Sequence, residues 1–132
     1  MKKFKAKGVI KKIGISVYTV NEVLDILKVF KPDVIQFPLN VFNQEFIQGS
    51  FLKSLKKKNI ILIARSLFLQ GTLCQKNYHN NFLNVWKDKF DKWEKYLLKE
   101  KNKAEEICLK FALSFKMIDY FILGVDNIDQ LR

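Results

Sequence analysis

Short apolar runs alternate along the chain with longer segments in which apolar residues recur every three or four positions. The first run covers residues 13–17 and is rich in β-branched residues, which is typical of a buried strand. The segment that follows, 20–30, has its apolar residues at helical spacing. Thr19, with Glu22 three residues later, predicts a capped start for this helix, and Pro32 predicts its end.

The same alternation continues to the end of the chain. It predicts further strands over 34–37, 60–64 and 118–123, helices over 44–57, 82–99, 104–115 and from 127 onward, and a long loop over 65–81. Strands that alternate with helices favour parallel pairing and right-handed crossovers, so the predicted class is α/β. No linker or low-complexity segment interrupts the pattern, and residues 1–132 are expected to form a single domain.

Two architectures fit this order of elements. The parallel β/α units could form a small open sheet, or they could be half of a TIM-type (β/α)8 barrel. A complete barrel of that type usually needs about 250 residues, and this chain has 132. Hydrophobic periodicity alone leaves both architectures open.

The composition excludes several classes of protein. With 48% hydrophobic and 14% aromatic residues the chain is too apolar for a disordered tail. No run approaches the roughly 18 apolar residues of a membrane span, and the basic N-terminus is not followed by the apolar core of a signal peptide. We therefore expect a cytoplasmic protein that makes no use of a membrane.

The net charge of +11 raises the question of nucleic-acid binding. Among the 24 basic residues only Arg65 and Arg132 are arginine, the residue on which specific base readers depend. We expect lysines spread over solvated faces and no nucleic-acid partner. The two cysteines, Cys74 and Cys108, lie far apart and form no metal-binding motif, so no metal site is predicted.

Polar residues follow all four predicted strands. In parallel α/β folds the ligand site lies at the carboxyl ends of the strands, and a glycine turn before a helix suits a phosphate. From the residue types alone, these polar residues could equally well only cap the ends of the strands and bind no ligand. These strand-end residues are Ser16, Gln36 with Asn40, Arg65 with Ser66, and Gly124 with Val125 and Asp126.

Four motifs, in order, resemble the aldo/keto reductase family. KKIGISVYTVNEVLDIL resembles its strand "IGVS" and the helix after it, and VIQFPLNVFNQ resembles its "VQ-P-N" strand. IILIARSLFLQGTL resembles "ARSPLLQGLL", and EEICLKFALSFKMIDYFILGVDNIDQL resembles the last helix, strand and helix, "LALRWVLS…VIVGVDSVEQL". The motifs cover nearly the whole chain and correspond to strands five to eight of the family's barrel, its C-terminal half.

The resemblance implies a nicotinamide cofactor, NADP with NAD as the alternative, at the ends of the strands. Ser16 and Gln36 would hold the nicotinamide carboxamide, although Val17 stands where many members have an asparagine. Arg65 belongs to the same predicted site. The remaining cofactor contacts implied are Ser66, Leu67 and Gly71 along the pyrophosphate and ribose, Gly124, Val125 and Asp126 at the adenosine phosphate, and Gln130 near the adenine.

The family's catalytic tyrosine, aspartate, lysine and histidine belong to the first four strands of its barrel. No residue of this chain is therefore assigned a catalytic role, and Tyr18, Tyr78 and His79 do not stand at the family's positions. Two interpretations of the function remain open. One is part of an NAD(P)H-dependent oxidoreductase that reduces a carbonyl substrate, incomplete alone. The other is a non-catalytic cofactor-binding or regulatory module, or a truncated fragment without activity.

Half a barrel would also lack the opposite wall of its interior. We expect an inner sheet face lined by Ile13, Ile15, Val34 and Ile61 to seek a partner. The partner would be a missing N-terminal half-barrel or a second copy of the chain.

Overall fold

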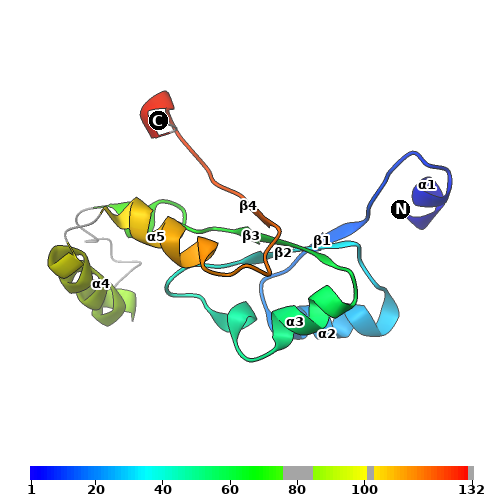
Figure 1. The fold of residues 1–132 in the computed structure, drawn as a ribbon, viewed down its shortest axis with the longest axis horizontal. Helices are drawn as coiled ribbons and strands as arrows, with labels where there is room; N and C mark the ends of the chain where they lie inside the picture. Colours follow the sequence, from blue (N-terminus) through cyan, green and yellow to red (C-terminus); the bar gives the residue numbers. More distant parts are fainter. Residues whose placement is uncertain (76–84, 101–102, 131–132) are drawn as a thin grey trace.

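The computed structural model describes residues 1–75, 85–100 and 103–130. Its centre is a four-stranded parallel sheet in which the strands lie side by side in sequence order (Figure 1). The strands are β1 (Gly14–Ser16), β2 (Val34–Pro38), β3 (Ile61–Arg65) and β4 (Tyr120–Phe121). The predicted parallel α/β class is confirmed, because β1 pairs with β2, β2 with β3 and β3 with β4, all in parallel.

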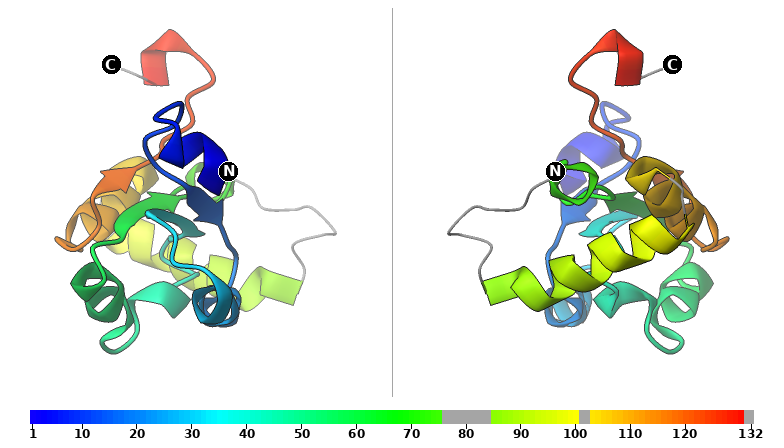
Figure 2. Two further views of the ribbon diagram at one scale, coloured as in Figure 1. Left: turned by 90° about the vertical axis from the view of Figure 1, so that its right-hand side faces the viewer. Right: turned by 90° about the vertical axis from the view of Figure 1, so that its left-hand side faces the viewer.

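Helices α2 and α3 cover one side of the sheet, and the C-terminal segment projects from the other (Figures 1 and 2). The α-helices are α1 (Lys2–Ala6), α2 (Val20–Val29), α3 (Phe51–Lys57), α4 (Lys87–Glu100) and α5 (Ala104–Leu113). Short 3-10 helices are η1 (Glu45–Ile47), η2 (Thr72–Cys74) and η4 (Ile128–Gln130).

The start of α2 follows the predicted capping pattern. The Glu22 amide donates to Thr19 Oγ1 at 3.3 Å, and the Glu22 carboxylate accepts from the Tyr18 amide at 2.7 Å. The Glu22 amide is one of those that a helix start leaves unpaired, whereas Tyr18 lies just before the N-cap Thr19. The amide of Val20, the first helical residue, donates to Glu45 Oε1 at 2.8 Å, which ties α2 to η1.

Several predicted boundaries were wrong. The helix predicted over 44–57 is divided into η1 and α3 because Gly49 adopts a left-handed backbone, with φ of +57°. The helix predicted from 127 is only the 3-10 helix η4, and α1 was not predicted. The strand predicted over 118–123 shortens to β4, and part of the helix predicted over 82–99 lies outside the described residues.

The helix-covered face of the sheet carries the main core. Ile35, Phe37, Leu62 and Ala64 are fully buried there. The ring of Phe37 stacks on that of Phe46 with 4.6 Å between centroids, so η1 closes the core over β2. Alternate residues of a strand point to opposite faces, which leaves the residues between these four on the other side.

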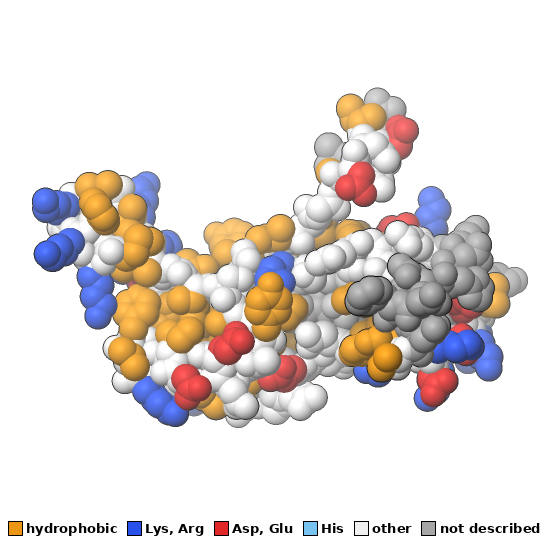
Figure 3. Space-filling model, turned by 180° about the vertical axis from the view of Figure 1, so that it is seen from behind, with side chains coloured by type: hydrophobic (Ala, Val, Ile, Leu, Met, Phe, Trp, Pro, Cys, Tyr) orange, Lys and Arg blue, Asp and Glu red, His pale blue; other side chains and the backbone are white. Residues whose placement is uncertain are grey.

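None of the described helices lies over that other side, which we call the open face. Val34 and Ile61 lie side by side on it, as do Gln36 and Ile63, and all four are half-buried. Hydrophobic side chains gather along this side of the body, at the foot of the C-terminal segment (Figure 3). The predicted inner face was correct for Val34 and Ile61 but wrong for Ile15, which pairs with Ile35 and packs on the helix-side core.

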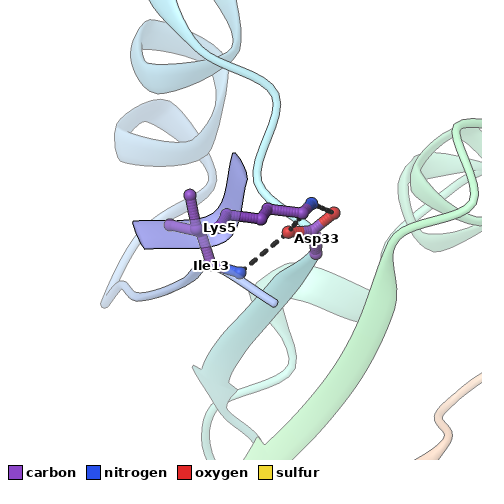
Figure 4. Close-up of polar contacts among 3 residues, drawn as sticks. All are labelled: Lys5, Ile13 and Asp33. Carbon is purple, nitrogen blue, oxygen red and sulfur yellow. Dashed lines mark hydrogen bonds and ion pairs between the residues drawn. The ribbon is translucent and has the colours of Figure 1, made fainter. Parts of the chain in front are cut away.

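Two aspartates lie just before β2 and β4 and clamp each strand to its neighbour. Asp33 accepts from the Ile13 amide at 2.8 Å and from Lys5 Nζ at 2.6 Å (Figure 4). Asp119 repeats the arrangement with the Leu62 amide at 2.8 Å and Lys56 Nζ at 2.7 Å. These contacts lie at the amino ends of the strands, the side that stabilises folds of this type and does not carry the ligand site.

The clamps lower the pKa of both carboxyl groups. The Lys5 ammonium and the Ile13 amide hold the pKa of Asp33 below its ordinary value. Partial burial alone would raise the pKa of Asp119, but hydrogen bonds from the Leu62 amide and Lys56 outweigh it and lower the pKa. A lowered folded-state pKa adds stability above the unfolded-state pKa of about 3.9, and this stability is lost as the pH falls through the folded-state pKa.

The Asp119→Asn variant should therefore lose stability at neutral pH. We expect the free energy of unfolding to fall by about 1–2 kcal/mol at pH 7, because charge-assisted hydrogen bonds to β3 and α3 are weakened. The deficit should shrink below about pH 4, where the wild-type carboxylate is also being protonated. Urea unfolding at pH 7 and pH 3 measures both values. Asp25→Asn, at an exposed pair with Lys28, is the control, and an equal deficit for Asp119→Asn at both pH values would contradict the account.

Candidate functional site

The first part of the predicted site is a polar pair on neighbouring strands. Ser16 is the last residue of β1 and lies in register with Gln36 of β2. The Ser16 hydroxyl donates to Gln36 Oε1 at 3.2 Å, so the two side chains meet on the open face. A serine hydroxyl and a glutamine amide together offer both donors and acceptors, as a carboxamide ligand requires.

Arg65, the last residue of β3, places a positive charge at the same edge. Its guanidinium donates to the Val17 carbonyl oxygen and to Ser66 Oγ, both at 3.3 Å. It also lies over the ring of Tyr18, 4.5 Å from the centroid, in a cation–π contact. These contacts hold the cation close to β1 while leaving further guanidinium N–H groups for an anion.

Ser66 follows β3 in a left-handed conformation, with φ of 61°. Such a backbone is costly for a residue other than glycine and persists only where surrounding contacts hold it. Two hydrogen bonds to the Ser66 carbonyl oxygen supply such contacts, one from Asn40 Nδ2 at 3.1 Å and one from the Leu69 amide at 3.0 Å. The Asn40 side chain is itself buried and accepts from the Phe42 amide at 3.0 Å and the Asn43 amide at 2.9 Å.

Asn40 therefore positions Ser66, a role that the predicted site did not include. The sequence signal is the asparagine of the VIQFPLN segment, which both follows a strand and matches the family motif, although neither observation gives it a partner. Its importance depends on contact with a segment 26 residues away, which a local pattern does not reveal.

The loop after Ser66 carries the next two predicted residues. Leu67 is 2% exposed and belongs to the main core, so only its backbone is available to a ligand. Leu69, Gln70 and Gly71 all have positive φ, and the value of +82° at Gly71 suits glycine. A Cβ at Gly71 would meet nothing within 4 Å, so backbone conformation and not space selects this glycine.

The remaining predicted residues lie apart from this group. Gly124, Val125, Asp126 and Gln130 are exposed and lie in the segment that projects from the sheet (Figure 1). Gln130 Oε1 accepts from the Asp126 amide at 2.7 Å, and the Gln130 amide donates to Asn127 Oδ1 at 3.0 Å. The segment is thus a turn closed on itself. Within the described residues, the helix predicted after Gly124 is the 3-10 helix η4.

Other chemistry finds little support in the described ranges. They contain no cluster of histidine, cysteine or acidic residues able to hold a metal ion, and none of their helices is long and apolar enough to cross a membrane. Burial raises the pKa of Cys74 to about 11 and that of Cys108 to about 12, so both thiols stay protonated and unreactive near neutral pH. Tyr78 and His79 lie outside the described residues.

Comparisons with known proteins agree with the motifs. Two solved structures, the holo and apo forms of the aldo-keto reductase AKR11C1 from Bacillus halodurans, each match with a TM-score of 0.74 and 20% sequence identity. Each match covers 98% of this chain, which spans only 45% and 46% of those chains. No curated protein matches. The model of the aldo/keto reductase family matches residues 1–132, and the chain belongs to that family.

Proposed function

We propose that this chain binds a nicotinamide cofactor, NADP in preference to NAD, along the carboxyl ends of its strands. In doing so it supplies the cofactor-binding half of a reductase that acts on a carbonyl substrate. The observation that carries the proposal is the Ser16–Gln36 pair at 3.2 Å, with Arg65 and Ser66 on the same edge of the sheet. Family membership over residues 1–132 supports the class of reaction.

The residues at this edge fit the parts of such a cofactor. Ser16 and Gln36 would hold the carboxamide and so fix which face of the nicotinamide ring is presented; the bound cofactor supplies the hydride. Arg65 and Ser66 would face its phosphates, with the backbone of Leu67 and Gly71 beside them. Gly124, Val125, Asp126 and Gln130 would serve the adenosine end, which requires the C-terminal segment to fold back over the sheet.

The proton donor would come from a complementary N-terminal half-barrel. Half-buried apolar side chains of Val34, Ile61 and Ile63 lie on the open face. In the part of the chain that the structure describes, β1 and β4 each have one neighbouring strand, so both are edge strands. Closing a TIM-type barrel takes eight strands, and the chain spans 45% of the length of a solved relative. A second copy is the weaker candidate for a partner, because a net charge of +11 on each copy opposes close association.

The alternative function, a non-catalytic cofactor-binding module, differs only in the absence of such a partner.

We also propose a cytoplasmic location, which the two free thiols support because disulfides form mainly in oxidising compartments.

The test of the cofactor site is a matched pair of serine variants. Ser16→Ala should weaken NADPH binding about tenfold, the effect of one good hydrogen bond, as measured by fluorescence titration. Ser54→Ala makes the same chemical change on α3, where the hydroxyl donates only to the Phe51 carbonyl oxygen, and should leave binding unchanged. Equal affinity of the Ser16→Ala variant and the wild type would remove Ser16 from the site.

A further inference from the structure

A second surface suited to binding a ligand lies where α4, α5 and the loop after β2 meet. It is an open groove of about 740 Å³, within the range of roughly 300–1,000 Å³ of small-molecule sites. We call it the lysine-rimmed groove. Its apolar lining comes from Val41, Phe42, Trp93, Tyr96, Ile107 and Phe111.

The floor of the groove is aromatic and held in place. The Trp93 indole N–H donates to the Leu73 carbonyl oxygen at 3.0 Å, and its ring stacks on that of Tyr96 with 6.0 Å between centroids. Phe42 meets Trp93 edge-on at 6.4 Å. Trp93 is 6% exposed and held in the core, and Tyr96, stacked on it, is 46% exposed and faces solvent. These aromatic rings suit an apolar chain or ring as ligand, because side chains that are already held in place lose little conformational entropy on binding.

The rim gives the groove a positive charge. Lys89, Lys92 and Lys110 line it against the single carboxylate of Glu100. The ion pair of Lys110 with Glu106 spans 3.7 Å between two exposed side chains, and such a pair contributes little that would oppose an incoming anion. The groove therefore combines an apolar floor with a cationic edge.

We propose that the lysine-rimmed groove binds an anionic amphiphile, namely a carboxylate that carries a medium-length alkyl or aryl-alkyl chain. The chain would lie on Trp93 and Tyr96, and the carboxylate would meet the lysines at the rim. The site is separate from the Ser16–Gln36 edge and does not rest on the cofactor proposal. Charge complementarity selects an anion over a cation of equal length.

The test uses decanoate as the probe and Trp93 as the reporter. The chain has two tryptophans, so the Trp86→Phe variant leaves Trp93 as the only one. In low salt at neutral pH, decanoate should change the Trp93 fluorescence saturably, whereas decyltrimethylammonium, with the same chain and the opposite charge, should not. Decanoate without effect, or an equal response to both probes, would overturn the proposal.

A charge-matched comparison then locates the site. Replacing Lys89, Lys92 and Lys110 with glutamine in the same background should weaken decanoate binding about tenfold, since each exposed charge contributes modestly. Replacing Lys95, Lys99 and Lys116, which are exposed but do not line the groove, changes the net charge equally and should leave binding within about twofold. Circular dichroism verifies that all variants fold. Equal weakening in both triple variants would overturn the proposal. So would a groove that binds an acidic amphipathic peptide but not decanoate.

Discussion

The Phe37→Ala variant is expected to lose about 3–5 kcal/mol of the free energy of unfolding. Phe37 is fully buried on β2 and stacks on Phe46, which η1 brings over the strand. The truncation removes the apolar area of a whole ring and leaves a cavity between the sheet and η1. A loss of this size is a large share of the roughly 5–15 kcal/mol that holds a domain folded, so we expect a strongly lowered urea midpoint.

Urea unfolding followed by circular dichroism measures this loss. The matched control is Phe4→Ala, because Phe4 lies on α1 with 55% of its surface exposed and should contribute less than about 0.5 kcal/mol. If Phe37→Ala and Phe4→Ala were equally mild, the helix-side core would not be the source of stability that its burial indicates.

The second large effect is expected for Asn40→Ala. The substitution removes a buried side chain that makes three hydrogen bonds, and it leaves the Phe42 and Asn43 amides and the Ser66 carbonyl oxygen without that partner. We expect the free energy of unfolding to fall by about 1–3 kcal/mol, mainly the cost of the acceptor that the Phe42 amide loses. The Asn43 amide keeps the Asn40 carbonyl oxygen, and the Ser66 carbonyl oxygen keeps the Leu69 amide. NADPH binding should weaken as well, because Ser66 loses one of the contacts that hold its left-handed backbone.

Asn21→Ala is the control for this variant. Asn21 is exposed on α2, where alanine is the better helix former, so the control should be neutral or slightly more stable. If Asn40→Ala lost stability but kept full NADPH affinity, the role of Asn40 would be limited to folding the loop after β2.

The strands were the most predictable part of the fold. Residues 34–37 and 60–64 are apolar apart from Gln36, because parallel strands under helices bury one whole face and half-bury the other. The start of α2 was equally readable, since Thr19 and Glu22 act within a few residues of each other. Gly49 was a visible warning that the apolar spacing over 44–57 does not continue through one helix.

The sequence placed polar residue types at the ends of the strands, but it did not contain the contacts that the structure gives them. Ser16 and Gln36 meet because β1 and β2 pair in parallel with this register, which strand-end reasoning anticipates. The support of Ser66 by Asn40 and the contact of Arg65 with Val17 depend on distant segments, so no local pattern contains them. Leu67 shows that a motif match does not place a side chain in a site, because this residue matches the family motif but packs in the core.

The decisive experiment for the proposed cofactor site is titration of the purified wild-type chain with NADPH and then with NADH. We expect saturable binding of NADPH in the micromolar range, tighter than that of NADH, because Arg65 and Ser66 would hold the additional phosphate beside Ser16 and Gln36. A folded chain that binds neither nucleotide would contradict the claim.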